Sequence, residues 1–349
     1  GDSGRGVRGP DHDATDRENF LTRAALLHVH RGEYSKAHDL LRKIKPTDAL
    51  SGRALYWLYE VEKKLGRASA EKTYARLTSQ HRFSFHALLA RDEKNAALTL
   101  AELPPKIPSR SKRQSGVNPM IAQVELLFKY GFYDTAGVLV EWALDRYSRL
   151  EPGVKLYLAS MGDAKSQVQT ATEIILFSRD WTTQKTLELA YPRAYLSVFA
   201  NNGSNMNPML LLSVAAVSFL FNSKAVSPAN ARGLLQMTPD TAAKLSGGEP
   251  NLLDPNTNVK LAAQYLDELL DRNDKKLHFA LACYNAGEEP VAKWKARFPT
   301  KDAVLFVDLI PYRETRDYVG YVLSNYYWYR KLYEPELANA SILREFRNY

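Results

Sequence analysis

Residues 210–242 read LLLSVAAVSFLFNSKAVSPANARGLLQMTPDTA, an apolar run followed at once by turn-forming residues. Pro208 suits the first turn of a helix, and the run from Met209 to Phe221 is apolar nearly all round, which is typical of a buried helix. The run is shorter than the roughly 20 residues that a helix needs to cross a bilayer. Ser227 and Gly233 then favour a turn with close backbone approach. We therefore expect a core helix that leads into a tight loop, and no membrane span.

Glycines recur between helix-periodic apolar segments in the first half of the chain. Gly32 and Gly66 are 34 residues apart, and Gly131 and Gly162 stand at similar places between later pairs of segments. Paired antiparallel helices stacked at this period resemble tetratricopeptide-type solenoids, in which each pair covers the apolar face of the next. The first half is therefore predicted to be an α-superhelix of helical hairpins.

The second half also has helical periodicity, and no stretch alternates as a strand would. Tyr191-Pro192 interrupts the preceding helix and marks the approach to a compact domain. Further helices are predicted over residues 258–273, 276–287 and 315–333. The predicted fold class is all-α. The predicted domains are a flexible tail over residues 1–16, an α-superhelical domain over residues 17–185 and a compact helical domain over residues 186–349.

The composition narrows the classes of site. The single cysteine, Cys283, excludes an intramolecular disulfide and a cysteine-based zinc site within the chain. His28 and His30 are two apart on a predicted helix and point to different sides, so they are not expected to bind a metal. No cofactor is expected.

The formal net charge of +8 favours acidic partners such as nucleic acid, anionic lipid or a carboxylate-bearing polymer. The basic residues are scattered, apart from the run KIPSRSKR over residues 106–113, which lies in a proline-rich segment. We interpret this run as a solvated loop and expect no nucleic-acid partner.

Four motifs in the second half occur in a characteristic order: YPRAY at 191–195, GLLQ at 233–236, YNAG at 284–287 and ETRDYV at 314–319. Together they resemble the motifs of the soluble lytic transglycosylases, lysozyme-like enzymes that cleave peptidoglycan between N-acetylmuramic acid and N-acetylglucosamine. Residues 54–77 and 82–90 are similar to the superhelical domain of the large periplasmic members. The resemblance implies a lysozyme-like α domain after the superhelix, no transmembrane segment, and a place in the periplasm or cell envelope.

The mechanism that the resemblance implies depends on one glutamate, in an E-S pair at the end of the first catalytic-domain helix. That acid protonates the glycosidic oxygen, and its carboxylate then removes a proton from the muramyl 6-hydroxyl, which closes a 1,6-anhydro ring. Counting back nine residues from Ser227, as the family pattern requires, leads to Ser218, and the chain has no glutamate between Glu188 and Glu249. Because a serine hydroxyl is a poor general acid or base near neutral pH, the expected catalyst is absent.

Other residues keep their places in the pattern. The resemblance implies that Glu314 supports and orients the cleft. It also implies a substrate-binding set that hydrogen-bonds acetamido groups, holds the cleft in shape or lines it: Ser227, Gln236, Met237, Tyr284 and Asn285. A C-terminal aromatic cluster is predicted mainly to pack in the core, with sugar stacking as the alternative; its members are Tyr321, Tyr326, Tyr327, Trp328 and Tyr329.

Three functions remain open from the sequence. The leading prediction is a catalytically inactive transglycosylase homologue that binds peptidoglycan glycan strands or acts as an envelope scaffold. The second is an active transglycosylase whose acid has moved to Glu288 or Glu289, although two solvated loop acids are the simpler interpretation of these residues. The third is a protein-interaction module in which the superhelix binds an envelope protein.

Overall fold

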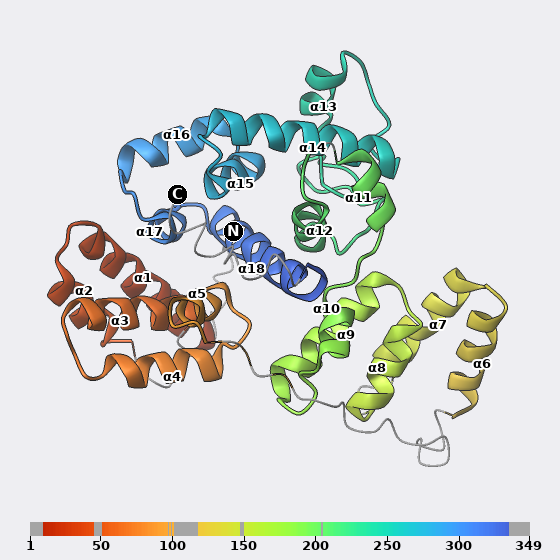
Figure 1. The fold of residues 1–349 in the computed structure, drawn as a ribbon, viewed down its shortest axis with the longest axis horizontal. Helices are drawn as coiled ribbons and strands as arrows, with labels where there is room; N and C mark the ends of the chain where they lie inside the picture. The colour runs from red at the N-terminus through yellow and green to blue at the C-terminus, as the bar shows by residue number, and fades with distance from the viewer. Residues whose placement is uncertain are drawn as a thin grey trace, which may run out of the picture. The chain divides into compact units, whose positions relative to one another are not determined.

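The computed structural model describes residues 10–44, 51–96, 98, 100, 118–146, 150–203 and 205–334. These residues form eighteen helices, with two isolated antiparallel bridges, Val226–Arg232 and Arg232–Met237 (Figure 1). The predicted all-α fold class is confirmed. No helix in the described ranges is long and apolar enough to cross a membrane. The basic run at 106–113 and residues 1–9 of the predicted tail lie outside the described residues.

The helices pack into two compact units, and the described residues within 1–98 and 269–324 form the first. Its helices are α1 (Pro10–His30), α2 (Tyr34–Leu41), α3 (Gly52–Lys64), α4 (Ala70–Gln80), α5 (Phe85–Glu93), α15 (Leu277–Ala286), α16 (Glu288–Arg297) and α17 (Ala303–Leu309). The described residues within 99–268 and 325–339 form the second unit. Its helices are α6 (Asn118–Lys129), α7 (Tyr133–Arg146), α8 (Pro152–Ser160), α9 (Ala164–Phe177), α10 (Gln184–Ala190), α11 (Leu196–Asn202), α12 (Pro208–Val217) and α13 (Pro239–Ser246). Helices α14 (Pro255–Arg272) and α18 (Arg313–Tyr333) have residues in both units. The domain boundary proposed at residues 185 and 186 stays a prediction.

The predicted helical hairpins are present. Gly32, Gly66 and Gly131 have φ values of 73°, 64° and 80°, in the left-handed region that favours glycine, and each turns the chain between two helices. Gly162 separates α8 from α9 without a positive φ; a Cβ atom there would come within 3.0 Å of Val140 Cγ1. Three of these glycines therefore allow the left-handed backbone of a turn, whereas the fourth allows close packing of neighbouring side chains.

Helix α1 begins at Pro10, so residues 10–16 of the predicted flexible tail are helical. Proline is well suited to the first helical position, because its φ is already near the helical value and its missing N–H would have no partner there. The prediction of a tail as far as residue 16 is therefore wrong for residues 10–16.

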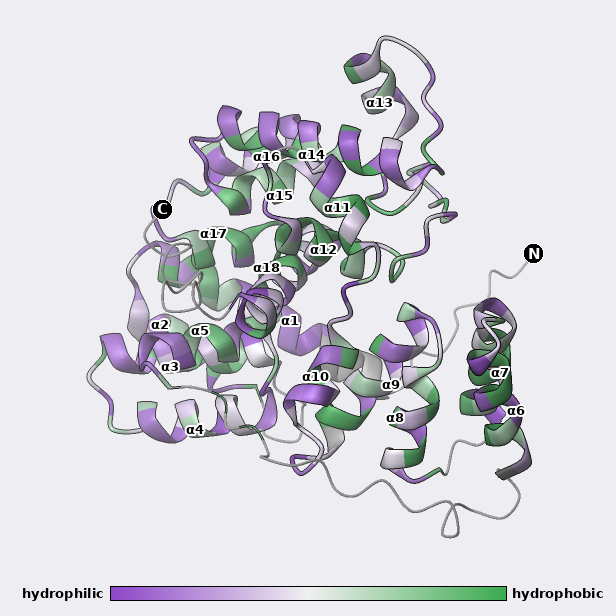
Figure 2. Ribbon diagram, turned by 45° about the vertical axis from the view of Figure 1, so that its right-hand side comes forward, coloured by the Kyte–Doolittle hydropathy of each residue, from purple (hydrophilic) through white to green (hydrophobic). Residues whose placement is uncertain are grey.

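Helix α12 is the core helix expected from the quoted stretch. The Asn207 side chain caps its first turn by accepting a hydrogen bond from Met209 N, at 2.7 Å, and Pro208 follows the cap. Residues 209–215 are buried, and the helix is hydrophobic along its length in Figure 2. Burial on all sides accounts for the absence of a polar face.

The end of α18 packs among aromatic residues of the second unit. Trp328 and Tyr329 are both 0% exposed. Trp328 stacks on Tyr191 with ring centroids 6.0 Å apart, and the Tyr329 hydroxyl donates to Pro192 O at 2.8 Å. The core role predicted for this cluster is correct for these two residues, whereas Tyr321 is 62% exposed.

Candidate functional site

Ser218 lies immediately after α12, at its C-terminal cap. It is half-buried, and its backbone N–H donates to Val214 O at 3.0 Å, which completes the last helical turn. The Ser218 side chain therefore stands at a helix end, the place where the resemblance puts the catalytic glutamate. A hydroxyl in this position can donate or accept a hydrogen bond, but it holds no titratable proton near neutral pH.

The three residues after Ser218 form an unusual turn. Phe219, Leu220 and Phe221 have φ values of 65°, 48° and 65°, all in the left-handed region. This region costs an L-residue other than glycine about 1–2 kcal/mol. Phe221 is 4% exposed and anchors the turn in the core, whereas Phe219 is 51% exposed. The chain thus holds backbone strain directly beside Ser218.

The loop after this turn is organised by Asn258, a residue of α14 that is 0% exposed. Its Oδ1 accepts from Leu235 N at 2.9 Å, and its Nδ2 donates to Arg232 O at 2.8 Å and to Leu252 O at 3.0 Å. Gly233 lies against it with φ 76°, and a Cβ atom there would come within 2.2 Å of Leu252 O. No motif in the sequence marks Asn258, since only the folded chain brings it to the GLLQ motif.

Within this loop the structure brings together Ser227, Gln236 and Met237. Ser227 Oγ accepts from Ala231 N at 3.0 Å, so this hydroxyl already closes the loop. Gln236 has φ 53°, and its Nε2 donates to Gly233 O at 2.9 Å. The buried Gln236 Oε1 has no hydrogen-bond donor among the described residues. Met237 is only 2% exposed, so its side chain packs in the core under the loop and presents almost no surface to a ligand.

The other predicted residues belong to the first unit, so the predicted site residues form two sets. Tyr284 and Asn285 are half-buried in the last turn of α15. Gly287, with φ 87°, ends α15 and caps the start of α16. Glu314 is exposed in the first turn of α18.

Glu288 and Glu289, the candidates for a relocated acid, are both ion-paired. Glu288 Oε1 lies 2.5 Å from Arg272 Nη1, and Glu289 Oε1 lies 2.6 Å from Lys293 Nζ. The hydrogen bond from Lys293, followed by its charge, holds the pKa of Glu289 below its usual value. A general acid for glycoside cleavage needs a raised pKa, so the environment of Glu289 is opposite to the one required.

Neither Cys283 nor His278 offers an alternative catalyst. Burial, with the nearby Glu288 charge, raises the pKa of the Cys283 thiol to about 11, so the thiolate is scarce at neutral pH. Burial, with the charges of Lys276 and Lys295, lowers the pKa of His278 to about 3. Among the described residues, no group of three histidine, cysteine, aspartate or glutamate side chains is arranged to hold a metal ion.

A known protein family matches the region that contains α12, the loop that Asn258 organises, and α15. The family model described as "Transglycosylase SLT domain" matches residues 196–307. These residues form an SLT domain.

Relatives of the SLT domain and its flanking helices bear the name soluble lytic murein transglycosylase. The protein of Salmonella typhimurium is 28% identical over 286 residues, which are 79% of this chain and 43% of the relative. The protein of Escherichia coli K12 is 31% identical over 230 residues, 58% of this chain and 34% of the relative. The chain thus spans less than half the length of these relatives.

Solved structures share the fold. The 70 kDa soluble lytic transglycosylase of Escherichia coli superposes with a TM-score of 0.70 at 24% identity, covering 89% of this chain and 51% of that one. An inactive mutant of the lytic transglycosylase Slt of Pseudomonas aeruginosa superposes with a TM-score of 0.71 at 23% identity, covering 92% and 53%. The predicted superhelix followed by a lysozyme-like SLT domain is confirmed as the fold of this chain.

Proposed function

We propose that this chain is a catalytically inactive homologue of the lytic transglycosylases that binds peptidoglycan glycan strands without cleaving them. The observation that carries the proposal is Ser218 at the end of α12, where the family resemblance requires the acid/base glutamate. The names of the relatives, soluble lytic murein transglycosylases, support murein as the ligand and the cell envelope as the place of action.

The loss of the glutamate removes both proton transfers of the implied reaction. A positioned acid or base contributes about 10²–10⁴ in rate for each transfer, and one carboxylate would supply both. Ser218 cannot replace it, and Glu289 has a lowered pKa where the chemistry needs a raised one. Cleavage is therefore expected to be negligible.

Binding of a glycan does not require the acid/base glutamate, and the loop of the SLT domain keeps groups that can contact a sugar. The half-buried Gln236 carries an amide, a group that pairs with the acetamido group of an N-acetylated sugar. Neutral amide and aromatic groups such as Asn285 and Tyr284 suit an uncharged sugar, because such a ligand is oriented by hydrogen bonds and apolar contact.

The test is to incubate the protein with purified sacculi, to measure the fraction that sediments with them, and to search the soluble products for 1,6-anhydro-muropeptides by mass spectrometry. We expect sedimentation without anhydro products. The matched variants are Gln236→Leu, which should reduce sedimentation, and Ser223→Ala, which should not. Absence of binding to sacculi would refute the proposal.

The relocated-acid alternative makes the opposite prediction in the same assay. Anhydro products from the unmodified protein that disappear in the Glu288→Gln, Glu289→Gln double variant would establish an active enzyme. Persistence of those products in the double variant would place the acid elsewhere.

A second candidate function, binding of an envelope protein through the helical hairpins, is favoured by exposed side chains on α7 and in the turn before it. Phe132 is 60% exposed, Val138 70% and Trp142 51%. Apolar groups at this exposure on one hairpin are typical of an interaction surface. Replacing Phe132 and Trp142 by serine in the full chain should abolish partner capture and leave binding to sacculi unchanged.

A further inference from the structure

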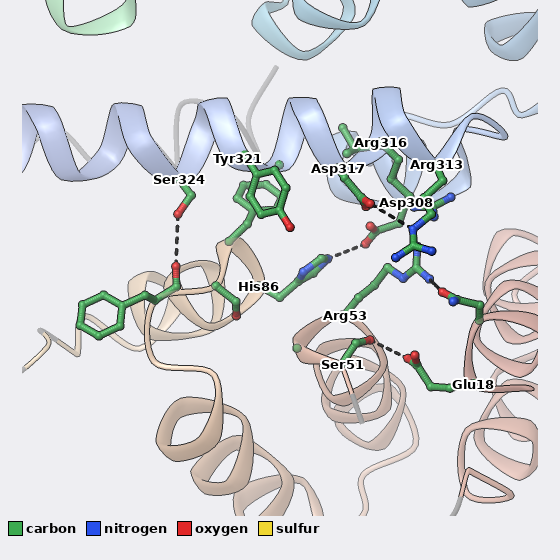
Figure 3. Close-up of a pocket in the computed structure, with 17 residues that line it drawn as sticks. Glu18, Ser51, Arg53, His86, Asp308, Arg313, Arg316, Asp317, Tyr321 and Ser324 are labelled. Carbon is green, nitrogen blue, oxygen red and sulfur yellow. Dashed lines mark hydrogen bonds and ion pairs between the residues drawn. The ribbon is translucent and has the colours of Figure 1, made fainter. Parts of the chain in front are cut away.

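A cavity of about 390 Å³ lies within the first unit, where the starts of α3 and α5 meet the first turns of α18 (Figure 3). Helices α1 and α17 complete its walls. This volume lies within the range of about 300–1,000 Å³ that is usual for small-molecule sites. No member of the predicted substrate-binding set lines it, whereas Tyr321, the exposed member of the C-terminal aromatic cluster, does.

Two helix N-termini meet at this cavity. Ser51 caps α3 by accepting from Ala54 N at 3.2 Å, and Ser84 caps α5 by accepting from Ala87 N, also at 3.2 Å. The two starts touch, since a Cβ atom on Gly52 would come within 2.7 Å of Ser84 Oγ. Each helix start carries a partial positive charge, so both favour an anion in the cavity.

Arginine side chains add full positive charge, and one of them has unused hydrogen-bonding capacity. Arg316 is 8% exposed, and its Nη1 donates to Ile310 O at 3.1 Å. Its buried Nε makes no hydrogen bond to any described residue; the Oδ1 atom of Asp317 lies 3.8 Å away, which is an ion pair but too long for a hydrogen bond. Arg53 lines the same cavity and donates to Asn19 Oδ1 at 2.9 Å.

The two guanidinium groups repel each other. Burial, followed by the charge of Arg53, lowers the pKa of Arg316 to about 10. An anion placed against both groups relieves this repulsion. Water alone does not, because it brings no compensating charge.

The carboxylates in the walls are already engaged. Asp308 Oδ2 accepts from Trp57 Nε1 at 2.6 Å and from His86 Nε2 at 2.8 Å, as Figure 3 shows for His86. Glu18 Oε1 accepts from Ser51 Oγ at 2.6 Å. The third carboxylate, Asp317, accepts from Arg313 Nε at 3.4 Å. The three carboxylates balance the charges of the three arginines in the walls, so a monoanion fits better than a phosphate dianion. The exposed ring of Tyr321 supplies apolar surface beside the charged groups.

We propose that this cavity binds the carboxylate end of a short peptide, of about amino-acid to dipeptide size, with Arg53 and Arg316 holding the carboxylate and Tyr321 covering the adjoining side chain. Arginine is the suitable residue, because its planar fork matches the two carboxylate oxygens. The site consists of residues of the first unit alone and does not rest on glycan binding by the SLT domain.

The first test uses two ligands that differ in one group. The full chain is titrated by calorimetry, in a low-chloride buffer, with N-acetyl-alanyl-alanine and with its C-terminal carboxamide. We expect saturable binding of the acid and about ten-fold or weaker binding of the amide, because the amide loses the charge-assisted hydrogen bonds. Equal affinity for the two ligands, or no saturation by the acid, would overturn the proposal. This comparison needs no variant and so does not depend on how a variant folds.

The second test uses variants of equal charge change. Arg53→Gln should weaken binding of the acid about ten-fold, whereas Arg67→Gln, an exposed arginine just beyond α3, should change it less than about two-fold. Equal weakening by both variants would mean general attraction to a basic chain, and would overturn the site. Displacement of the acid by inorganic phosphate at lower concentration than by free N-acetyl-alanyl-alanine would mean an inorganic anion site instead.

Discussion

Single residues decide the shape of the loop beside Ser218, and Gly233 shows how little room that loop leaves. Both its φ of 76° and the carbonyl of Leu252 exclude a larger side chain. The sequence indicated close backbone approach at Gly233 because the residue follows turn-forming positions. Nothing in it marks Asn258, because two of its three hydrogen bonds join residues that are 23 and 26 positions away along the chain.

We expect Gly233→Ala to lower the free energy of unfolding by about 3 kcal/mol, because a buried backbone contact and a disfavoured φ are combined at one position. Urea denaturation measures the change. The matched variant is Gly137→Ala in α7, where a Cβ atom meets nothing within 4 Å. That change should stabilise the protein by about 0.5–1 kcal/mol. A Gly233→Ala protein as stable as the wild type would show that the loop can move away from Leu252.

A second prediction at this scale concerns the left-handed turn. Phe219→Gly should be more stable than Phe219→Ala by about 1 kcal/mol, because only glycine is free of strain at φ 65°. The Gly and Ala variants lose the same aromatic ring, so their difference isolates the backbone. In the interior of α13, Ala243→Gly should instead cost about 1 kcal/mol. Thermal unfolding of the three variants measures whether glycine stabilises the protein at position 219 and destabilises it at position 243. A Phe219→Gly protein less stable than Phe219→Ala would rule out strain at this turn.

At the scale of the element, most helices followed from periodicity and from their terminal residues. The predicted helices over 258–273, 276–287 and 315–333 are confirmed as α14, α15 and α18, with boundaries that differ by a few residues. The recurring glycines located four hairpins, although only three of these glycines adopt a positive φ. The helical start at Pro10 was missed because the tail was judged by its polar composition, which says little about a helix whose apolar positions come later.

Helix α15 carries a pH-sensitive element, His278, which is 3% exposed. Its pKa is about 3 in the folded chain, mainly through burial, against 6.5 for an unperturbed histidine. Below pH 6.5, His278 of the unfolded chain therefore binds a proton, whereas His278 of the folded chain binds one only below about pH 3. Stability is fully present above pH 6.5, and it should fall by about 1.4 kcal/mol per pH unit as the pH drops through this window.

The measurement is the free energy of unfolding in urea at pH 7, 6 and 5 for the wild type and for His278→Phe. The variant keeps a ring beside Phe279 and Phe306 but cannot titrate. Its slope against pH should be flatter than that of the wild type, since all other groups are common to both. Equal slopes would mean that His278 is protonated in the folded chain.

At the scale of the whole molecule, contacts between distant parts of the sequence complete the first unit. Trp57 and Asp308 are 251 positions apart, and His86 and Asp308 are 222 apart. No local pattern in the sequence marks these three residues as partners. The cavity with Arg53 and Arg316 was unpredictable for the same reason, whereas the motifs of the SLT domain were readable because each is a short contiguous string.

The buried carboxylate of Asp308 makes the free energy of unfolding depend on pH in the acid range. Burial would raise its pKa, but the charge and hydrogen bond of His86, with Arg53 and Trp57, outweigh burial and lower it below 3.8. The stabilisation is therefore present above pH 3.8 and is lost as the pH falls through the lowered pKa of the folded state. At pH 7, Asp308→Asn should cost about 3–5 kcal/mol.

The difference in unfolding free energy between wild type and Asp308→Asn should narrow steadily below pH 3.8. There the unfolded wild type binds a proton at Asp308, whereas the folded wild type does so only at its lowered pKa. Asp240→Asn, at an exposed position in α13, provides the control and should change stability by less than about 0.5 kcal/mol. A gap between wild type and Asp308→Asn that stays constant with pH would show that the shape of the side chain matters and its charge does not.

The discontinuity of the first unit has a consequence during synthesis on the ribosome. Helices α3 and α5 emerge early, but Asp308 arrives 251 residues after Trp57. At about 5–20 residues per second this interval is roughly 10–50 s. For that time the apolar faces of the first hairpins have no final partner, so the nascent chain depends on its own early contacts or on a chaperone to stay soluble until α17 arrives.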